Sequence, residues 1–515
     1  MSDGGRLSRL GLPLVLLLAL GLFAWGIDWG LPSWRGWAGD ELLPQSVSQG
    51  LAKRFSGGWH TKYPPFHYYL LALVQTPIRR LLQGTDRFEV HEHLMLAGRW
   101  LSVTLALGTV WLIYRTGREI YGRRGAVFAG LAAALMPTLV YFAKTANVDG
   151  PFLFWIAASL LFYVRLLDRH RLRDYVLFTA CAFVAVATKD QAYGLYVLSP
   201  LVILPSLRRH LGAGWVKTLL DRRVLAAVAT AVVVFVLSFN IPWNSRGFSR
   251  HVGLLTGSQS EEAQAYPNSP SGHLQNMAQA LRDLEFCVGA PVFAAALLGI
   301  GWTFFQALFQ ENRRERSRLG ALLVLGLSYC LTFLSVVLFS RDRYVLPLGL
   351  ILALFAGHLF GALTAPGAWR SLRIGAATAA LAYSFLLALS VDLRMVNDSR
   401  YDAERWLRDR APLPRQAVAV GRAKHSPRIS VVEWRQVWRT EGRVLQRPGT
   451  RFVVVNLSDL RSPEERRLYE RLRAGEFGHR LAESSRWRSP WDRLDTRGRF
   501  TTLDLVNPRL EVYER

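Results

Sequence analysis

The sequence predicts an α-helical membrane protein that crosses the bilayer many times and ends in a small α/β domain. Hydrophobic residues make up 51% of the 515-residue chain, yet the chain also holds 63 lysines and arginines. Long apolar runs separated by basic loops are typical of multi-span membrane proteins. A nucleic-acid binder would instead carry its basic charge on a soluble domain, so we expect no nucleic-acid partner.

About eleven apolar runs approach the roughly 20 residues that a transmembrane helix needs. The fifth and sixth runs are short and share a polar break at Thr188-Lys189-Asp190, and such breaks usually line a cavity. No small-residue cleavage site follows the first run, so we expect a retained span rather than a signal peptide. The runs lie near residues 10–29, 96–115, 125–143, 149–166, 174–188, 190–206, 223–241, 287–308, 318–339, 344–364 and 372–391.

The basic clusters between these runs predict one orientation. With eleven spans and a cytoplasmic N-terminus, every cluster falls on the cytoplasmic side, as the positive-inside rule requires. The clusters lie near Arg6 and at 115–124, 165–174, 207–223, 311–318 and 369–373. We therefore expect a multi-pass protein of the inner (plasma) membrane. Its outer side would hold the loop 30–95, the turn 144–150, the Lys189 break, the loop 242–286, the turn 340–344 and the C-terminal part.

Two domains follow from this threading: a transmembrane domain over 1–391 and an extracytoplasmic α/β domain over 392–515. The outer loop 30–95 contains two stretches with helical apolar spacing, 41–55 and 65–82, which we expect to lie in the membrane interface. Tryptophans in and before this loop fit an interfacial aromatic belt. In the terminal domain, Ser462 with Glu464 and Glu465 predicts the start of a helix.

The cysteines and histidines carry little functional signal. Cys181, Cys287 and Cys330 fall in or beside apolar segments without metal-ligand spacing, and we interpret them as small core residues. His91 and His93 would point to different sides of a helix, so we expect no zinc site there.

Three carboxylates are candidates for chemistry. Asp40 and Glu41 follow the first span, and Asp149 lies at an equivalent depth in the next outer turn. An acidic pair in a loop is most often simply solvated, but ionisable residues at span ends of membrane proteins tend to mark sites. Carboxylates from two loops that meet at one cavity could act as a general base or hold a divalent cation.

Several basic residues are predicted on the outer side, where short loops normally carry few. Each lies next to a span end, at the level where a lipid phosphate would sit, and lysine and arginine both bind phosphate. The alternative is that these side chains extend to lipid headgroups without a specific ligand. The residues are Lys62, Lys144, Lys189, Arg341 and Arg343.

An ordered series of motifs resembles the C-type membrane glycosyltransferases, and within them the protein-mannosyltransferase and aminoarabinose-transferase group. The series begins with Asp40–Glu41 and the turn Tyr63-Pro64-Pro65. It continues with "ANVDGPFLFW" (146–155), "ATKDQAYG" (187–194) and "RDRYVLPL" (341–348). The terminal domain resembles that of bacterial members through "SRYDAERWLRD" and the closing "LEVYER".

The resemblance implies the GT-C fold and transfer of a sugar from a polyprenyl-phosphate donor to an acceptor on the outer face, with inversion at the anomeric carbon. It implies that Asp40 is catalytic, with Glu41 beside it and Asp149 at the second acidic position. It implies donor-phosphate binding by Lys62, Lys189 and Arg341 or Arg343. No cofactor is required, although a divalent cation on the three carboxylates remains an alternative. The acceptor could be a protein, a lipid or a glycan.

Two other functions stay open at this point. Broken spans and charges at membrane depth would also suit a transporter or flippase of a lipid-linked or anionic substrate. The chain could otherwise be a membrane-anchored binding or assembly protein that acts through its terminal domain. Deletion of residues 400–515 would distinguish the two classes: a binding module would lose all function, whereas a transferase could keep some turnover.

Overall fold

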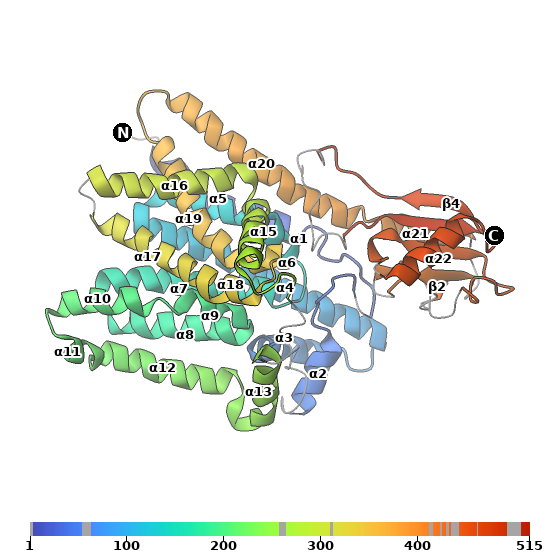
Figure 1. The fold of residues 1–515 in the computed structure, drawn as a ribbon, viewed down its shortest axis with the longest axis horizontal. Coiled ribbons are helices and arrows are strands. Elements are labelled where there is room, and N and C mark those ends of the chain that lie inside the picture. Colours follow the sequence, from blue (N-terminus) through green and yellow to red (C-terminus); the bar gives the residue numbers. More distant parts are fainter. Residues whose placement is uncertain are drawn as a thin grey trace. The chain divides into compact units, whose positions relative to one another are not determined.

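A computed structural model describes most of the chain, and Figure 1 shows its ribbon. The described residues form two compact units. The first contains Met1–Ala24, Leu42–Gln83 and Ala97–Leu389, and the second contains Trp25–Glu41, Gly84–Leu96 and Ser390–Arg515. The described residues are 4–34, 36–53, 63–256, 264–309, 313–410, 416–422, 425–428, 432–433, 442–460, 462–491 and 506–515.

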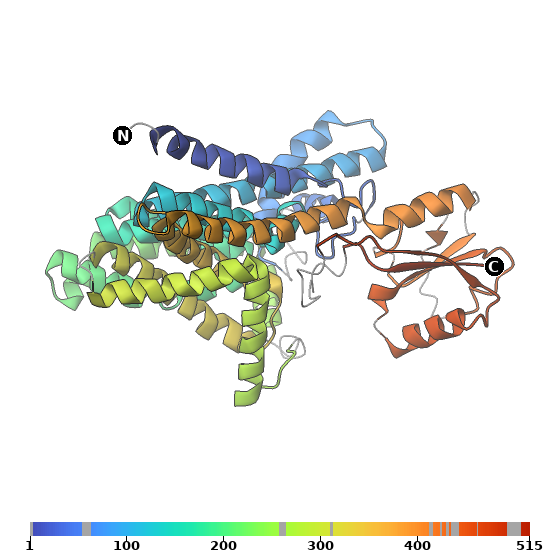
Figure 2. The ribbon, with the colours of Figure 1, turned by 90° about the horizontal axis from the view of Figure 1, so that it is seen from above.

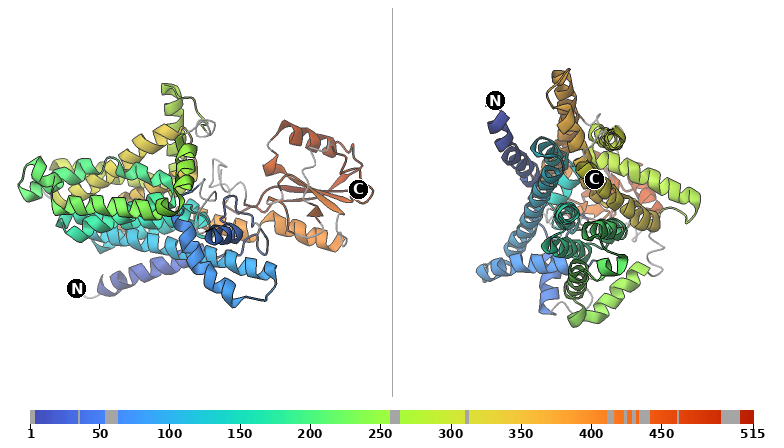
Figure 3. Two further views of the ribbon diagram at one scale, coloured as in Figure 1. Left: turned by 90° about the horizontal axis from the view of Figure 1, so that it is seen from below. Right: turned by 90° about the vertical axis from the view of Figure 1, so that its left-hand side faces the viewer.

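The first unit is built of helices, seen end-on in the right-hand view of Figure 3. Helix α7 packs on α8, α8 on α12, and α5 and α16 both pack on α19. The helices up to α9 are α1 (Gly4–Ala24), α2 (Pro44–Ala52), α3 (Phe66–Leu81), α4 (Arg87–Tyr121), α5 (Arg123–Ala134), α6 (Pro137–Ala143), α7 (Asp149–Arg169), α8 (Leu172–Thr188) and α9 (Tyr193–Tyr196). Those that follow are α10 (Pro200–Leu211), α11 (Trp215–Leu219), α12 (Arg222–Ser238), α13 (Ile241–Thr256), α15 (Pro270–Val288), α16 (Ala290–Phe309), α17 (Arg313–Tyr329), α18 (Ser335–Val337), α19 (Leu346–Leu363) and α20 (Arg370–Val396).

Small residues allow α5 and α19 to approach closely. A Cβ on Gly357 would lie 2.6 Å from Cβ of Ala129, and a Cβ on Gly361 would lie 2.8 Å from Cα of Gly125. Glycines four residues apart on one helix are a common device for close helix packing inside membranes. The spacing of these glycines in the sequence thus accounts for the close packing of α5 and α19.

The chain is a multi-pass membrane protein. In the described residues, five helices are long and apolar enough to cross a membrane, and eight are if each strongly bent helix pair counts as one span. The first predicted span, 10–29, is a shorter apolar helix over Leu10–Ala24. The two stretches predicted in the loop 30–95 are the helices α2 and α3. The number eleven remains a prediction.

The predicted break between the fifth and sixth runs is confirmed. Helix α8 ends at Thr188, and Lys189 is extended with φ −153° and ψ 119°. A short 3₁₀ turn over Asp190–Ala192 leads into α9. Gly194 keeps this segment close to the π-helical turn Cys330–Leu334 that follows α17, because a Cβ there would lie 2.8 Å from Cβ of Phe333.

The second unit contains a five-stranded sheet with strand order β2-β1-β3-β5-β4. Strand β1 pairs in parallel with β2 and β3, whereas β5 pairs antiparallel with β3 and β4. The strands are β1 (Ala417–Val420), β2 (Val432–Glu433), β3 (Phe452–Asn456), β4 (Arg480–Ser485) and β5 (Leu510–Glu514). The fold class predicted from the sequence, a helical membrane protein with a small α/β domain, is confirmed.

One helix covers each face of this sheet, as Figure 2 shows. Val418 and Val420 pack with Leu468 and Leu472 of α22 (Pro463–Arg473). Ala417, Ala419 and their neighbours on the other face pack with α21 (Ser399–Arg410). This division follows from the alternation of side chains along a strand. The predicted start of α22 is confirmed, because Ser462 and Glu465 form a reciprocal capping box.

The second unit is larger than the terminal domain expected from the sequence. It includes Trp25–Glu41, which contains the acidic pair, together with Gly84–Leu96. The sequence-based division assigns both segments to the transmembrane part. The loop that carries Asp40 and Glu41 therefore packs with the terminal α/β domain.

Candidate functional site

The first candidate residue, Asp149, is the first residue of α7 and is buried. Its backbone N–H donates to Oδ1 of Asn147 over 2.7 Å, so the preceding turn caps the helix. The next residue has to be small, because a Cβ on Gly150 would lie 3.0 Å from the carbonyl oxygen of Phe142. The "ANVDGP" stretch thus places one carboxylate inside the protein at the start of a span.

Two of the predicted cations meet at this carboxylate. Nζ of Lys189 forms an ion pair with Oδ1 of Asp149, and Nη1 of Arg343 lies 3.8 Å from Oδ2. The three residues come from α7, from the break after α8 and from the turn Asp342–Tyr344 before α19. Side-chain exposure is 8% for Lys189, 12% for Arg343 and 1% for Asp149. Three segments distant in the sequence therefore form one buried charged cluster.

Aromatic rings line the cluster. Nζ of Lys189 lies 5.3 Å from the ring centroid of Phe152 and 5.2 Å from that of Tyr344. Cζ of Arg343 lies 5.6 Å from the same Tyr344 ring. Cation–π contacts hold ammonium and guanidinium groups at such distances. Because little water reaches these charges, their electrostatic effect on a bound anion is stronger than at an exposed site.

A second ion pair lies next to Lys189 in the sequence. Oδ1 of Asp190 lies 3.0 Å from Nε2 of His251, whose side chain is 2% exposed. His251 belongs to α13, which is kinked at Asn244. Sequence reasoning missed this histidine, because a single histidine in a long loop has no pattern that relates it to a distant aspartate.

Polar contacts from α17 and from the π-helical turn Cys330–Leu334 after it hold the chain beyond the break. Oγ of Ser328 donates to the carbonyl oxygen of Gly194 over 2.6 Å, and Oγ1 of Thr332 donates to the same oxygen over 3.2 Å. The carbonyl group has no helical partner here, so side chains supply its hydrogen bonds. These hydrogen bonds fix the segment that follows Lys189.

The remaining predicted cations have different surroundings. Arg341 is exposed, and its Cζ lies 5.0 Å from the ring centroid of Phe339. Lys144 is buried, and its Nζ donates to the carbonyl oxygen of Leu22 over 2.7 Å. Lys62 lies outside the described residues. Of the two arginines that the sequence left open, Arg343 is thus the one at Asp149.

Asp40 and Glu41 lie in a turn before α2, and both are half-buried. Leu42 follows directly, and its backbone N–H donates to the carbonyl oxygen of Ala146 over 2.6 Å. Leu42 also packs in one apolar cluster with Val148. The chain just after the acidic pair is therefore fastened to the turn that contains Asp149.

The loop before the acidic pair is fastened to the terminal domain by hydrogen bonds. Nε1 of Trp29 donates to Oδ2 of Asp398 over 3.0 Å, and Nε1 of Trp37 donates to the carbonyl oxygen of Ser426 over 3.1 Å. The backbone N–H of Gly30 donates to the hydroxyl of Tyr401 over 3.1 Å. These tryptophans are buried, so they anchor the loop in protein rather than in the membrane interface.

In the described part of the chain, no group of three or more His, Cys, Asp or Glu side chains is arranged to hold a metal ion. Asp149 already forms ion pairs with two cationic side chains. The site as described is therefore suited to binding an anion through Lys189 and Arg343.

Comparisons with known proteins identify one matching family and several structures of similar fold. Residues 87–243 match the family described as dolichyl-phosphate-mannose-protein mannosyltransferase. The structure is similar to the archaeal oligosaccharyltransferase AglB from Archaeoglobus fulgidus, which was solved with an inhibitory peptide and a dolichol-phosphate. The TM-score is 0.50 and the sequence identity 12%, and the match covers 100% of this chain and 89% of that chain. ArnT from Cupriavidus metallidurans, solved with undecaprenyl phosphate, gives TM-score 0.48 and 14% identity over 99% and 98% of the two chains.

No curated protein matches the sequence. The matched segment 87–243 contains Asp149 and Lys189, which form the buried ion pair. The resemblance stated from the sequence motifs is thereby confirmed. The chain has the GT-C fold of the oligosaccharyltransferase, and over residues 87–243 it matches the glycosyltransferase family of dolichyl-phosphate-mannose-protein mannosyltransferases.

Proposed function

We propose that the protein transfers a sugar from a polyprenyl-phosphate donor to an acceptor on the outer face of the cell's inner membrane. The observation that carries this proposal is the buried cluster in which Lys189 and Arg343 converge on Asp149. The family match over 87–243 supports it. So does the likeness in fold to a protein solved with a dolichol-phosphate.

The two cations would bind the phosphate that leaves with the lipid. Negative charge grows on this phosphate as the anomeric bond breaks, so fixed cations stabilise the transition state more than the ground state. Asp149 would hold both cations in place before the donor arrives, since two buried cations without a counter-charge would be costly. Lys62, from the same series of motifs, is proposed as a further phosphate contact.

Asp40 is the proposed general base, with Glu41 beside it. A hydroxyl or amine acceptor is a weak nucleophile until a base accepts its proton, and such a base contributes typically about 10²–10⁴-fold. Direct attack on the anomeric carbon, opposite the departing phosphate, would invert its configuration. The N-terminus would then be cytoplasmic and the terminal domain extracytoplasmic, as the basic loops predict.

The test is turnover by the purified full-length protein in lipid nanodiscs. A panel of polyprenyl-phosphate sugars is offered with cell-envelope extract as the acceptor, and release of polyprenyl phosphate is measured. Turnover by the wild type, reduced at least about a hundredfold by Lys189→Met, supports the proposal. Release without transfer, or movement of the donor across a bilayer by reconstituted protein, would contradict it and favour a flippase.

A further inference from the structure

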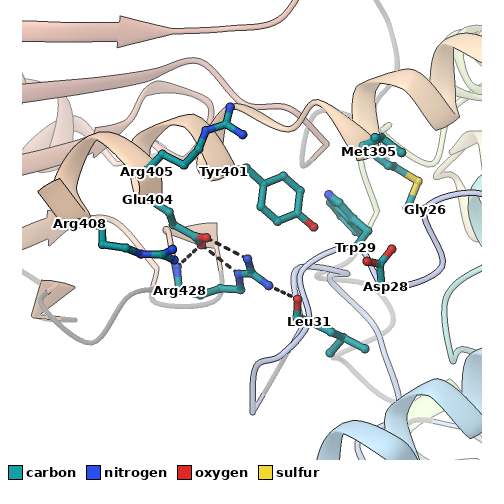
Figure 4. A pocket seen from close by; sticks show the side chains of 11 residues that line it. Gly26, Asp28, Trp29, Leu31, Met395, Tyr401, Glu404, Arg405, Arg408 and Arg428 are labelled. Carbon is teal, nitrogen blue, oxygen red and sulfur yellow. Dashed lines mark hydrogen bonds and ion pairs between the residues drawn. The ribbon is translucent and has the colours of Figure 1, made fainter.

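A cavity lies within the unit that contains the terminal domain. Its volume is about 360 Å³, within the range of about 300–1,000 Å³ that is usual for small-molecule sites. Figure 4 shows the side chains around it. They come from the loop after α1, the end of α20, α21 and the segment after β1: Gly26, Asp28, Trp29, Leu31, Met395, Val396, Tyr401, Glu404, Arg405, Arg408 and Arg428.

One wall of this cavity is fixed by an ion pair. The buried carboxylate of Glu404 accepts hydrogen bonds from the backbone N–H of Arg428 over 2.6 Å, from its Nε over 3.0 Å and from its Nη2 over 2.9 Å. Nη1 of Arg428 donates to the carbonyl oxygen of Leu31. The charges of Arg428 and Glu404 are therefore paired, and Arg428 links the loop at Leu31 to α21. This wall of the cavity is held in place without a ligand.

Two further arginines line this cavity and, unlike Arg428, are not paired with a buried carboxylate in the described part of the chain. Arg405 and Arg408 lie three residues apart on α21, so they share one helix face, and both are exposed. Arg405 pairs with the half-exposed Asp402, and exposed pairs of this kind are weak. Among the described residues, no ion pair joins Arg408 to a carboxylate. Two guanidinium groups are thus available to an anion, whose oxygens they can bind in pairs.

The cavity also holds a hydrogen-bond acceptor and a neutral hydroxyl group, Asp28 from the loop after α1 and Tyr401 from α21. Asp28 is exposed and lies at the cavity with a carboxylate that can accept hydrogen bonds from a hydroxyl or an ammonium group. The hydroxyl of Tyr401 accepts from Gly30 over 3.1 Å and keeps its proton to donate to a ligand. In Figure 4 the carboxylate of Asp28 and the guanidinium of Arg405 lie on different sides of the Tyr401 ring.

We propose that this cavity binds a phosphate ester that also carries hydroxyl or amino groups, with the phosphate on Arg405 and Arg408 and a donor group on Asp28. The favoured source, which rests on the proposed function, is the sugar acceptor. The loop that lines the cavity at Gly26–Leu31 runs on to Asp40, the proposed base, within the same compact unit. A membrane phospholipid is also a phosphate ester and is the second possible source. It could reach the cavity because Val396, the last residue of the apolar helix α20, lines it.

The first test measures binding and does not depend on activity. Glycerol 3-phosphate is titrated onto the full-length protein in phosphatidylcholine nanodiscs and followed by ³¹P NMR. We expect saturable binding that Arg405→Gln/Arg408→Gln weakens at least about tenfold. The matched control is Arg410→Gln, which removes the same charge from the same helix beside Trp406, away from the cavity. Absence of binding, or equal weakening by the control, would overturn the proposal.

The second test identifies the source of the phosphate ester. If the acceptor binds here, the double variant raises the KM for the acceptor about tenfold or more and leaves the KM for the donor unchanged. If a membrane lipid binds here, phosphatidylglycerol in the nanodisc displaces glycerol 3-phosphate from the wild type and the acceptor KM does not move. Wild-type turnover without glycerol 3-phosphate binding would refute the cavity assignment alone. Binding of glycerol 3-phosphate without turnover of any donor would refute only the proposed transferase activity.

Discussion

The guanidinium carbon of Arg400 lies 4.0 Å from the ring centroid of Trp37 and 5.3 Å from that of Trp29. The same guanidinium group pairs with Asp398, and both side chains are completely buried. Arg400 thus fills the space between the terminal domain and the loop that ends in Asp40 and Glu41. A stacked arginine with a carboxylate partner is a specific arrangement that lysine does not reproduce.

Loss of Arg400 should destabilise the protein strongly. Arg400→Ala leaves Asp398 buried without its cation, which costs about 3–5 kcal/mol, whereas Arg405→Ala removes an exposed pair worth about 0–1 kcal/mol. Urea midpoints of the two variants, followed by tryptophan fluorescence, provide the comparison. In a double-mutant cycle, Arg400→Met with Asp398→Leu should lose less than the sum of the single changes. Equal midpoints for Arg400→Ala and Arg405→Ala would contradict this account.

The terminal domain should be required for turnover. Truncation after Val396 removes the partners of Trp29, Gly30 and Trp37, so the loop before Asp40 would lose its fixed course. The sequence alone leads us to expect that a transferase keeps some turnover without this domain. Given these contacts, we instead expect release of polyprenyl phosphate to fall below detection, although the truncated chain still inserts in membranes. Turnover by the truncated chain comparable to the wild type would mean that the loop is positioned without the domain.

Arg343 and Arg341 form a matched pair for testing the phosphate site. Arg343 lies at Asp149 and is nearly buried, whereas Arg341, two residues earlier, is exposed over Phe339. Arg343→Gln should reduce turnover about 10²–10³-fold, the usual effect of removing one group that stabilises developing negative charge. Arg341→Gln should reduce it less than tenfold. The reverse order, measured as release of polyprenyl phosphate at saturating donor, would move the site to Arg341.

Low pH should destabilise the terminal domain through protonation of Asp459. Burial acts to raise the pKa of Asp459, but hydrogen bonds from the His425 ring and from the backbone N–H of Arg422 outweigh it and hold this pKa below its ordinary value. A lowered native pKa gives stability that is complete above the unfolded pKa, about 3.9, and is lost as the pH falls through the native value.

The corresponding measurement compares urea midpoints at pH 7, 5 and 3.5. Asp459→Asn should be less stable than the wild type at pH 7 and should lose less stability between pH 5 and 3.5. Asp402→Asn, at an exposed position on α21, is the control. If the urea midpoint of the wild type falls no more steeply with acid than that of Asp459→Asn, this carboxylate does not contribute to the acid dependence of stability.

The positions of the candidate residues at span ends could be predicted from the sequence, but most of their partners could not. Apolar runs and motif order were enough to place Asp149, Lys189 and the turn with Arg343 at span ends, because each signal is local. The ion pair between Asp190 and His251 could not be predicted, since it joins residues whose separation in the chain follows no period. The same holds for the cavity at Arg405 and Arg408, whose spacing alone is that of any solvated helix face.

The tryptophans show why local signals can mislead about context. Trp29 and Trp37 lie beside a predicted span, where an interfacial belt is the usual explanation. In the structure both are buried against Arg400 and bond to the terminal domain. Their partners lie more than three hundred residues later in the chain. Only the tertiary structure reveals that the acidic loop belongs with that domain.

The most direct test of the central claim is turnover by Asp40→Asn. The substitution keeps the size of the side chain and removes the base, so we predict that release of polyprenyl phosphate falls at least about a hundredfold while the urea midpoint is unchanged. Asp402→Asn, a carboxylate on α21 that is absent from the cavity lining, should keep wild-type turnover. Full turnover by Asp40→Asn would contradict the account and leave Glu41 or Asp149 as the base.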